Sequence, residues 1–295
     1  LALVAINELP LDKQVTVSAE SANMEGSAAG IGAGGVYTVN DLLHGLLMAS
    51  GNDTAHALAQ ELGGDEATLQ KVNALAQQLG MNDTRVATYT GLDRPGMSSS
   101  AWDMALAYRA AFGNETFAQI VDTQSYPFPG FDDLSGFELW NDNALYLNDP
   151  EGIGGKTGYT DDANHTFVGA VNHDGRHLVA VVLDTTVNKA RAWQQAQQLL
   201  HESYRFGPGT SVATLEAASS QAPTALQTPT ATAQAPGGAA VAEAQAGPGS
   251  RALPWLPVAI VGAVLALAGA AVIASRALTT TPGRHRGHQG QRRRR

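Results

Sequence analysis

Two short segments of this 295-residue chain carry side chains that can move protons and hold a charged group. The first is Ser50-Gly51-Asn52, which offers a hydroxyl and an amide, and the second is Lys156-Thr157-Gly158, which offers an ammonium and a hydroxyl. Each also has an ordinary structural explanation, because glycine ends helices, asparagine begins them and a strand lysine is normally solvated. Their order and their separation of about a hundred residues make the pair more specific than either segment alone.

The sequence before residue 150 predicts a cluster of helices that would position the first segment. Helical periodicity and end signals indicate helices over residues 41–49, 53–62, 66–79 and 101–112. A capping-box pattern, Thr38-Val39-Asn40-Asp41, opens the first of them, and Gly63-Gly64 ends the second. Ser50-Gly51-Asn52 is therefore expected on an interhelical turn.

The sequence after residue 150 predicts an antiparallel sheet that would position the second segment. Strands are expected over residues 153–159, 166–172 and 177–183, and His173-Asp174-Gly175-Arg176 forms a hairpin turn between the last two. An amphipathic helix over 189–206 should pack on this sheet through Trp193, Leu199 and Leu200. The expected fold class is an α/β sandwich of a helical cluster and an antiparallel sheet, with Lys156 on the first strand.

Composition limits the chemistry of the folded part. Residues 1–206 carry 25 acidic against 10 basic side chains, a charge of −15, which argues against binding nucleic acid. The chain has no cysteine, so disulfides, thiolate zinc sites and cysteine nucleophiles are excluded. None of its eight histidines forms a metal-type pair at helical i, i+4 spacing with a carboxylate partner, so we expect no metal and no cofactor.

The remainder of the chain predicts attachment to a membrane. Residues 207–254 are rich in Ala, Pro, Thr, Gln and Gly, which favours a linker without a core. Residues 255–275 contain no charge over 21 positions, about the length needed to cross a bilayer as a helix. The tail 276–295 is basic, which marks the cytoplasmic side. We therefore expect a single-pass protein of the cell membrane, with residues 1–206 outside the cytoplasm.

Four stretches of the folded part resemble the low-molecular-mass D-alanyl-D-alanine carboxypeptidases, which are penicillin-binding proteins. They are residues 23–30 (NMEGSAAG), 41–53 (DLLHGLLMASGND), 90–96 (TGLDRPG) and 155–161 (GKTGYTD). The pair of tripeptides is typical of this superfamily, and Gly51 in place of aspartate favours the carboxypeptidases over class A β-lactamases. The resemblance implies a β-lactamase/transpeptidase-like fold, with residues 1–206 as a domain that lacks its N-terminal part.

The resemblance also implies roles for individual residues. Ser50 would carry protons toward the leaving D-alanine nitrogen, and Asn52 would position the substrate peptide, so these two are the catalytic candidates. The substrate-binding candidates would hold the terminal carboxylate with an ammonium and a hydroxyl, admit the substrate at a glycine and donate a backbone N–H to the oxyanion. They are, in that order, Lys156, Thr157, Gly158 and Tyr159.

The nucleophilic S-x-x-K motif of the resembled family is missing from the chain. None of the four lysines, at positions 13, 71, 156 and 189, follows a serine by three residues. We expect the motif just ahead of Leu1, so the 295 residues alone should be inactive, with no base placed near Ser50. The expected function is removal of the terminal D-Ala from peptidoglycan pentapeptides, with β-lactams as inhibitors. A catalytically silent peptidoglycan-binding membrane protein and a β-lactamase stay open, as do the balance with endopeptidase activity, a Ser-His-Asp triad and the oligomeric state.

Overall fold

The computed structural model describes residues 1–207, 209–211 and 213–216, all of which fall in one compact unit, Leu1–Leu226. The predicted span 255–275 and basic tail 276–295, and the predicted linker from residue 217 on, lie outside the described residues. None of the helices in the described ranges has the length and apolar character needed to traverse a bilayer. The membrane anchor therefore stays a prediction.

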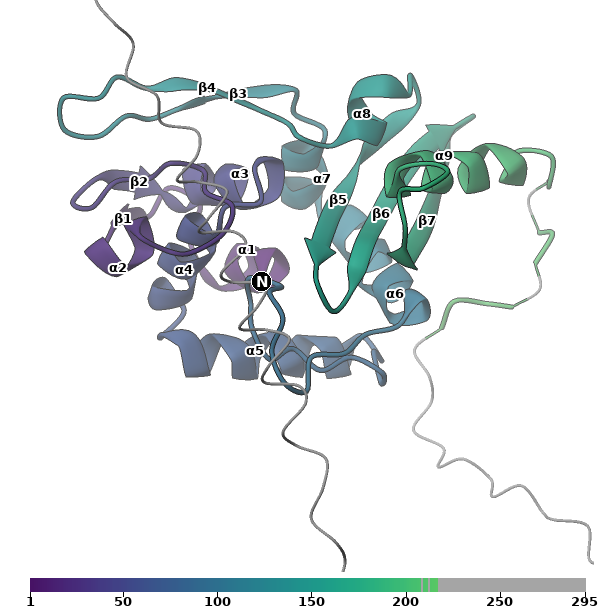
Figure 1. Ribbon diagram of the computed structural model, residues 1–295, viewed down its shortest axis with the longest axis horizontal. Coiled ribbons are helices and arrows are strands. Elements are labelled where there is room, and N and C mark those ends of the chain that lie inside the picture. The colour runs from purple at the N-terminus through teal and green to yellow at the C-terminus, as the bar shows by residue number, and fades with distance from the viewer. Residues whose placement is uncertain (208, 212, 217–295) are drawn as a thin grey trace, which may run out of the picture. The chain divides into compact units, whose positions relative to one another are not determined.

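Helices make up most of the first 150 residues, and the four that the sequence predicts are all present (Figure 1). The helices are α1 (Ala2–Glu8), α2 (Ala19–Ala22), α3 (Val39–Met48), α4 (Asn52–Glu61), α5 (Asp65–Gln78), α6 (Ala101–Phe112), α7 (Glu115–Val121), α8 (Ala144–Asn148) and α9 (Ala192–Ser203). The capping box that opens α3 is confirmed, because Thr38 Oγ1 accepts from Asp41 N at 3.0 Å and Asp41 Oδ2 accepts from Thr38 N at 2.7 Å. The helix begins two residues earlier than expected, since Thr38 itself is the N-cap.

The strands form two small hairpins and a three-stranded antiparallel sheet of order β5-β6-β7. The strands are β1 (Gln14–Thr16), β2 (Val36–Thr38), β3 (Ser125–Phe128), β4 (Phe137–Trp140), β5 (Gly152–Thr160), β6 (Asn164–His173) and β7 (Arg176–Thr185). Asp174 and Gly175 join β6 to β7 with φ angles of 51° and 77°. Two left-handed residues are what a two-residue hairpin turn requires, so the predicted turn is confirmed.

The sheet is covered on both faces, which confirms the α/β sandwich. In Figure 1, α9 crosses one face of the sheet, and α6 and α7 lie on the other. Odd-numbered β6 residues such as Phe167 and Val171 pack in the α9 cluster, whereas Val168 joins the core of the helical cluster. The prediction that Leu199 packs on the sheet is wrong, because its side chain is 56% exposed. The neighbouring Leu200 is buried instead. Adjacent helical positions point about 100° apart, so only one of the two can face the sheet.

The hairpin β3–β4 was not expected from the sequence, and it packs on the helical cluster. Its tip packs tightly on the loop before β2, because a Cβ atom at Gly32 would lie 1.9 Å from the Phe131 ring. Tyr126 on β3 donates its hydroxyl to Asp41 Oδ1 at 2.6 Å and stacks on His44 at 3.7 Å between ring centres. These contacts hold the open end of the hairpin against α3, close to the point where the loop after β4 begins.

Candidate active site

Ser50 occupies a strained position in the turn between α3 and α4. Its φ angle is 59°, in the left-handed region that glycine adopts readily and that costs other residues free energy. The next residue, Gly51, has a φ of −62°, so the glycine of the tripeptide is not the residue in the left-handed conformation. The conformation at position 50 therefore costs free energy that a glycine there would not cost.

Lys156 lies on β5, the edge strand of the sheet, and two glycines before it shape the backbone. Gly154 and Gly155 have φ angles of 118° and 150°, and a Cβ atom at Gly155 would lie 2.1 Å from the carbonyl oxygen of Val168. The pairing of β5 with β6 shifts register between Gly152 and Gly154. Only glycine fits this close approach, and the irregular pairing sets the face on which Lys156 lies.

The structure brings the two predicted segments together, because Lys156 Nζ donates a hydrogen bond to Ser50 Oγ. Nζ also donates to the carbonyl oxygen of Thr157 at 3.1 Å. Burial lowers the pKa of Lys156, and the negative charge of Asp142 acts in the opposite direction. Lys156 is therefore a titratable group in contact with the Ser50 hydroxyl, and the expectation that no base is placed to activate Ser50 stays a prediction. Sequence separation hid this contact, because the two residues stand 106 positions apart.

Asp142, which the sequence analysis did not single out, completes the cluster around Ser50. It lies in the loop between β4 and α8, and its Oδ2 accepts from Ser50 Oγ at 3.3 Å. Its backbone N–H donates to the carbonyl oxygen of Met48 at 3.0 Å, so the loop is fastened to the end of α3. The available signal was the polar run Asn141-Asp142-Asn143 directly after a strand, where functional side chains often lie.

Asn52 is buried at the start of α4, and its side chain is already engaged. Its Nδ2 donates to the carbonyl oxygen of Glu25 at 2.7 Å, and its backbone N–H donates to that of Ser27 at 2.7 Å. Gly26 leaves room for this amide, since a Cβ atom there would lie 2.4 Å from Asn52 Nδ2. Asn52 therefore joins the loop over residues 25–27 to the turn that carries Ser50.

Asp53 extends the same attachment through its buried carboxylate. Its oxygens accept from four backbone N–H groups at 2.8 to 3.2 Å. The donors are Ala29, Gly30, Ile31 and Thr54. A carboxylate held by several backbone donors is a strong and directional brace. The loop before β2 is thus fixed to the first turn of α4, beside the candidate site.

The remaining predicted residues follow Lys156 along β5. Thr157 and Tyr159 have exposed side chains, and the Tyr159 hydroxyl donates to Asp161 Oδ1 at 3.3 Å. Gly158 lies opposite Thr166, where a Cβ atom would come within 2.5 Å of Thr166 Oγ1. A side chain at 158 would therefore force the Thr166 hydroxyl to move, which favours glycine for a reason separate from the predicted approach of a substrate.

A serine–histidine pair does exist in the described part of the chain, but it is inaccessible. Ser21 Oγ lies 2.8 Å from His56 Nδ1, and the two residues are 1% and 2% exposed. A nucleophile must reach its substrate, so this pair is structural and offers no Ser-His-Asp site. Over residues 1–207, 209–211 and 213–216, no three His, Asp or Glu side chains are grouped to hold a metal ion.

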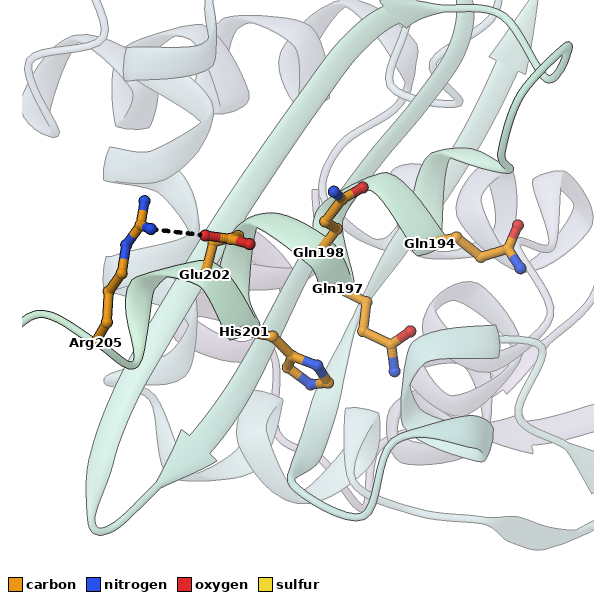
Figure 2. Close-up of a pocket in the computed structure, with 6 residues that line it drawn as sticks. All are labelled: Gln194, Gln197, Gln198, His201, Glu202 and Arg205. Atoms are coloured by element: carbon orange, nitrogen blue, oxygen red, sulfur yellow. Dashed lines mark ion pairs between the residues drawn. The ribbon is translucent and has the colours of Figure 1, made fainter.

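The outer side of α9 forms a polar hollow that contains none of the predicted site residues. Figure 2 shows its six lining side chains, with Glu202 paired to Arg205 at 3.3 Å. Two of them reach the buried carboxylate of Asp149: Gln197 Nε2 donates at 2.8 Å, and His201 Nε2 lies at 2.7 Å. These contacts fasten α9 to the segment just before β5.

A comparison with known families identifies the chain. The sequence profile of the D-alanyl-D-alanine carboxypeptidase peptidases matches residues 1–187. The chain belongs to the D-alanyl-D-alanine carboxypeptidase family. Within this family it is 41% identical over 219 residues to DacB2 of Mycobacterium tuberculosis, an alignment that covers 73% of this chain and 75% of that protein. It is 31% identical to DacF of Bacillus subtilis, and spans about half of that carboxypeptidase's length, 49%.

Solved structures agree with the family assignment. A D-alanyl-D-alanine carboxypeptidase from Mycobacterium tuberculosis is 40% identical and superposes with a TM-score of 0.69, over 72% of this chain and 81% of its own. The Streptomyces DD-transpeptidase is 26% identical, with a TM-score of 0.65, over 70% and 84%. The predicted family, enzyme class and transpeptidase-like fold are confirmed. The roles given to Ser50, Asn52 and residues 156–159 stay predictions.

Proposed function

We propose that residues 1–206 form the greater part of a serine-type domain that removes the terminal D-alanine from peptidoglycan stem peptides. The observation that carries the proposal is the contact between Lys156 Nζ and Ser50 Oγ, made by an edge strand and an interhelical turn. It supplies an ammonium and a relay hydroxyl in one place, which acyl transfer from a peptide with a free carboxylate requires.

The reaction proceeds through an acyl-enzyme. A serine hydroxyl attacks the carbonyl carbon of the penultimate D-alanine, the new ester forms as the peptide C–N bond breaks, and the hydroxyl proton passes to the leaving amine. Water then hydrolyses the ester, restores the hydroxyl and releases the shortened peptide. We assign the nucleophile and its lysine to an S-x-x-K segment ahead of Leu1, because no lysine of the 295 residues follows a serine by three. β-Lactams would acylate the same serine as substrate mimics.

The residues of this chain bind the substrate and move its protons. Lys156 binds the terminal carboxylate together with the Thr157 hydroxyl, and Ser50 passes a proton to the leaving amine. The backbone N–H of Tyr159, on the edge strand β5, is a donor for the oxyanion. Asn52 holds the substrate peptide with the amide hydrogen that it does not give to Glu25.

The experiment that tests this function replaces Lys156 in protein that includes the S-x-x-K segment. Charge-assisted hydrogen bonds contribute about 1.5–3 kcal/mol, so Lys156→Ala should lower kcat/KM for a D-Ala-D-Ala peptide roughly ten- to a hundredfold or more. A matched peptide with a neutral terminus should lose much less. Lys156→Arg should recover part of the activity, because it restores the charge with a larger planar group.

Three results would change the proposal. An equal loss on charged and neutral substrates would remove carboxylate recognition from Lys156 and leave it a role in the strand or the proton path. Binding of peptidoglycan without turnover by the unsubstituted protein would identify a silent binding module. Rapid turnover of penicillin would identify a β-lactamase instead, since that activity needs efficient deacylation.

A further inference from the structure

The position of Asp142 beside the site is built into the fold. Its own backbone N–H bonds to Met48 at the end of α3, as described above. The preceding residue, Asn141, is 4% exposed, and its Nδ2 donates to the carbonyl oxygens of Val121 and Thr123 at 3.0 and 2.9 Å. Asp142 itself is exposed, and within the described part of the chain its carboxylate accepts one hydrogen bond, from the Ser50 hydroxyl. Its neighbours thus fix the loop, and the carboxylate is free to act on the site.

With Lys156 as an ammonium and Asp142 as a carboxylate, the hydrogen bonds around Ser50 have one consistent direction. An ammonium can only donate, so Ser50 Oγ accepts from Lys156 Nζ, and an ionised carboxylate can only accept, so Ser50 Oγ donates to Asp142 Oδ2. The hydroxyl hydrogen therefore points toward Asp142, and a lone pair points toward Lys156. The three groups form an ordered donor chain from Lys156 through Ser50 to Asp142.

The surroundings of Lys156 make Asp142 the charge that governs its protonation. The groups that face Nζ are the Ser50 hydroxyl and the Thr157 carbonyl oxygen, and the β6 residue opposite Lys156 is the apolar Val168. Burial disfavours the ammonium and so lowers the pKa of Lys156, whereas the charge of Asp142 raises it. Without Asp142, this lysine would keep its desolvation and lose its counter-charge.

We propose that Asp142 is a positioning residue that keeps Lys156 protonated and orients the Ser50 hydroxyl, so that Lys156 serves as a cation and proton donor and does not act as a base. The inference rests on the proposed function, because it assigns the charge state that carboxylate binding by Lys156 needs. It also explains how a desolvated amine can contact Ser50 without making Ser50 a nucleophile: an ammonium has no lone pair with which to take the hydroxyl proton.

Titration of the lysines by NMR tests this inference on the 295-residue chain, with no need for turnover. The chain has four lysines, so the signals of ¹³C-labelled Lys side chains can be assigned with single Lys→Arg variants. Asp142→Asn should lower the titration midpoint of Lys156 by about one to two pH units, as expected for losing a unit charge several ångströms away. Asp142→Glu, which keeps the charge, should restore most of the shift. Asp133→Asn, which removes an exposed carboxylate from the β3–β4 tip, is the matched control and should leave the midpoint unchanged.

The outcomes separate this inference from the proposed function. A midpoint unchanged in Asp142→Asn, or lowered equally in Asp133→Asn, would overturn the role of Asp142. In protein that includes the S-x-x-K segment, the alkaline limb of kcat/KM should move to lower pH in Asp142→Asn by the same amount as the NMR midpoint. If that protein cleaves no D-Ala-D-Ala peptide, the proposed function fails, while the titration still decides what Asp142 does to Lys156.

Discussion

Two aspartates lie beside Ser50-Gly51-Asn52, one next to it in sequence and one close to it in space, and their carboxylates are held in opposite ways. Asp53, just after Asn52, is 1% exposed and accepts four backbone N–H bonds. Asp142, across the turn from Ser50, is exposed and accepts one longer bond from a hydroxyl. The first carboxylate has its hydrogen-bonding capacity filled by the backbone, and the second keeps capacity in reserve. The turn over residues 50–52 is therefore held in place on the side of Asp53, and its polar groups stay available for chemistry on the side of Asp142.

The largest expected effect separates these two aspartates by stability. Asp53→Ala leaves four backbone N–H groups without their acceptor, and unsatisfied buried donors cost about 1–3 kcal/mol each, without simple additivity. We expect a loss of about 3–5 kcal/mol in the free energy of unfolding for Asp53→Ala, measured by urea denaturation of residues 1–295. Asp142→Ala should change it by no more than about 0.5 kcal/mol, as exposed substitutions usually do. Asp53→Asn keeps one acceptor oxygen and should fall between them, and similar losses at positions 53 and 142 would erase the contrast.

A smaller effect concerns Asp149, which is buried like Asp53 but is held mainly by side chains. Burial raises the pKa of Asp149, but hydrogen bonds from Gln197, the Glu151 N–H and His201 outweigh it and lower the pKa below its ordinary value. A lowered carboxyl pKa stabilises the fold fully above the unfolded pKa, about 4, and this stability is lost as pH falls through the folded pKa.

The matching measurement is the free energy of unfolding as a function of pH. Asp149→Asn should lose about 1–2 kcal/mol at pH 7, and its curve should be flatter below pH ~4 than that of the unsubstituted chain. Gln198→Ala, on the same helix, is the control and should leave the acid limb in place. An acid limb that persists unaltered in Asp149→Asn would mean that other carboxylates carry it.

The smallest effect concerns strain at Ser50. Ser50→Gly should be about 1 kcal/mol more stable than Ser50→Ala, because glycine relaxes in the left-handed conformation and alanine does not. Both variants lose the hydroxyl, so both should lose carboxypeptidase activity in protein with the S-x-x-K segment. Thermal unfolding of the two variants gives the comparison. Equal stabilities would show that the turn at 50 carries no strain and that serine there needs no functional explanation.

Local patterns predicted the elements of the fold and much less of the site. The capping box at Thr38 and the Asp174-Gly175 turn depend on neighbouring residues, so they could be located from the sequence to within two positions. The hairpin β3–β4 was missed because its strands are short and Pro127 interrupts the first, which weakens a strand pattern. The direction of Leu199 was wrong because Leu199 and Leu200 offer the same hydrophobicity, and only the docking angle of α9 decides between them.

The site was predicted as two separate segments, and its third member was not predicted. Ser50 and Lys156 were recognised by motif, yet their contact depends on how the sheet docks against the helices, which no local pattern encodes. Asp142 has no motif of its own, and its place is set by backbone bonds to Met48 and by the buried Asn141. Its charge matters only once those contacts bring it beside Ser50.

The shift of register between Gly152 and Gly154 makes the site depend on a count of residues as well as on their identity. Successive side chains of a strand leave from opposite faces, so every residue after the irregularity takes its side from the number of residues before it. Removing one glycine from this stretch would keep the residues Lys156, Thr157 and Gly158 in the sequence. It would also move each of them to the opposite face of the strand. The lysine would then turn away from Ser50, so a deletion here would break the contact between Lys156 and Ser50 although both residues remain.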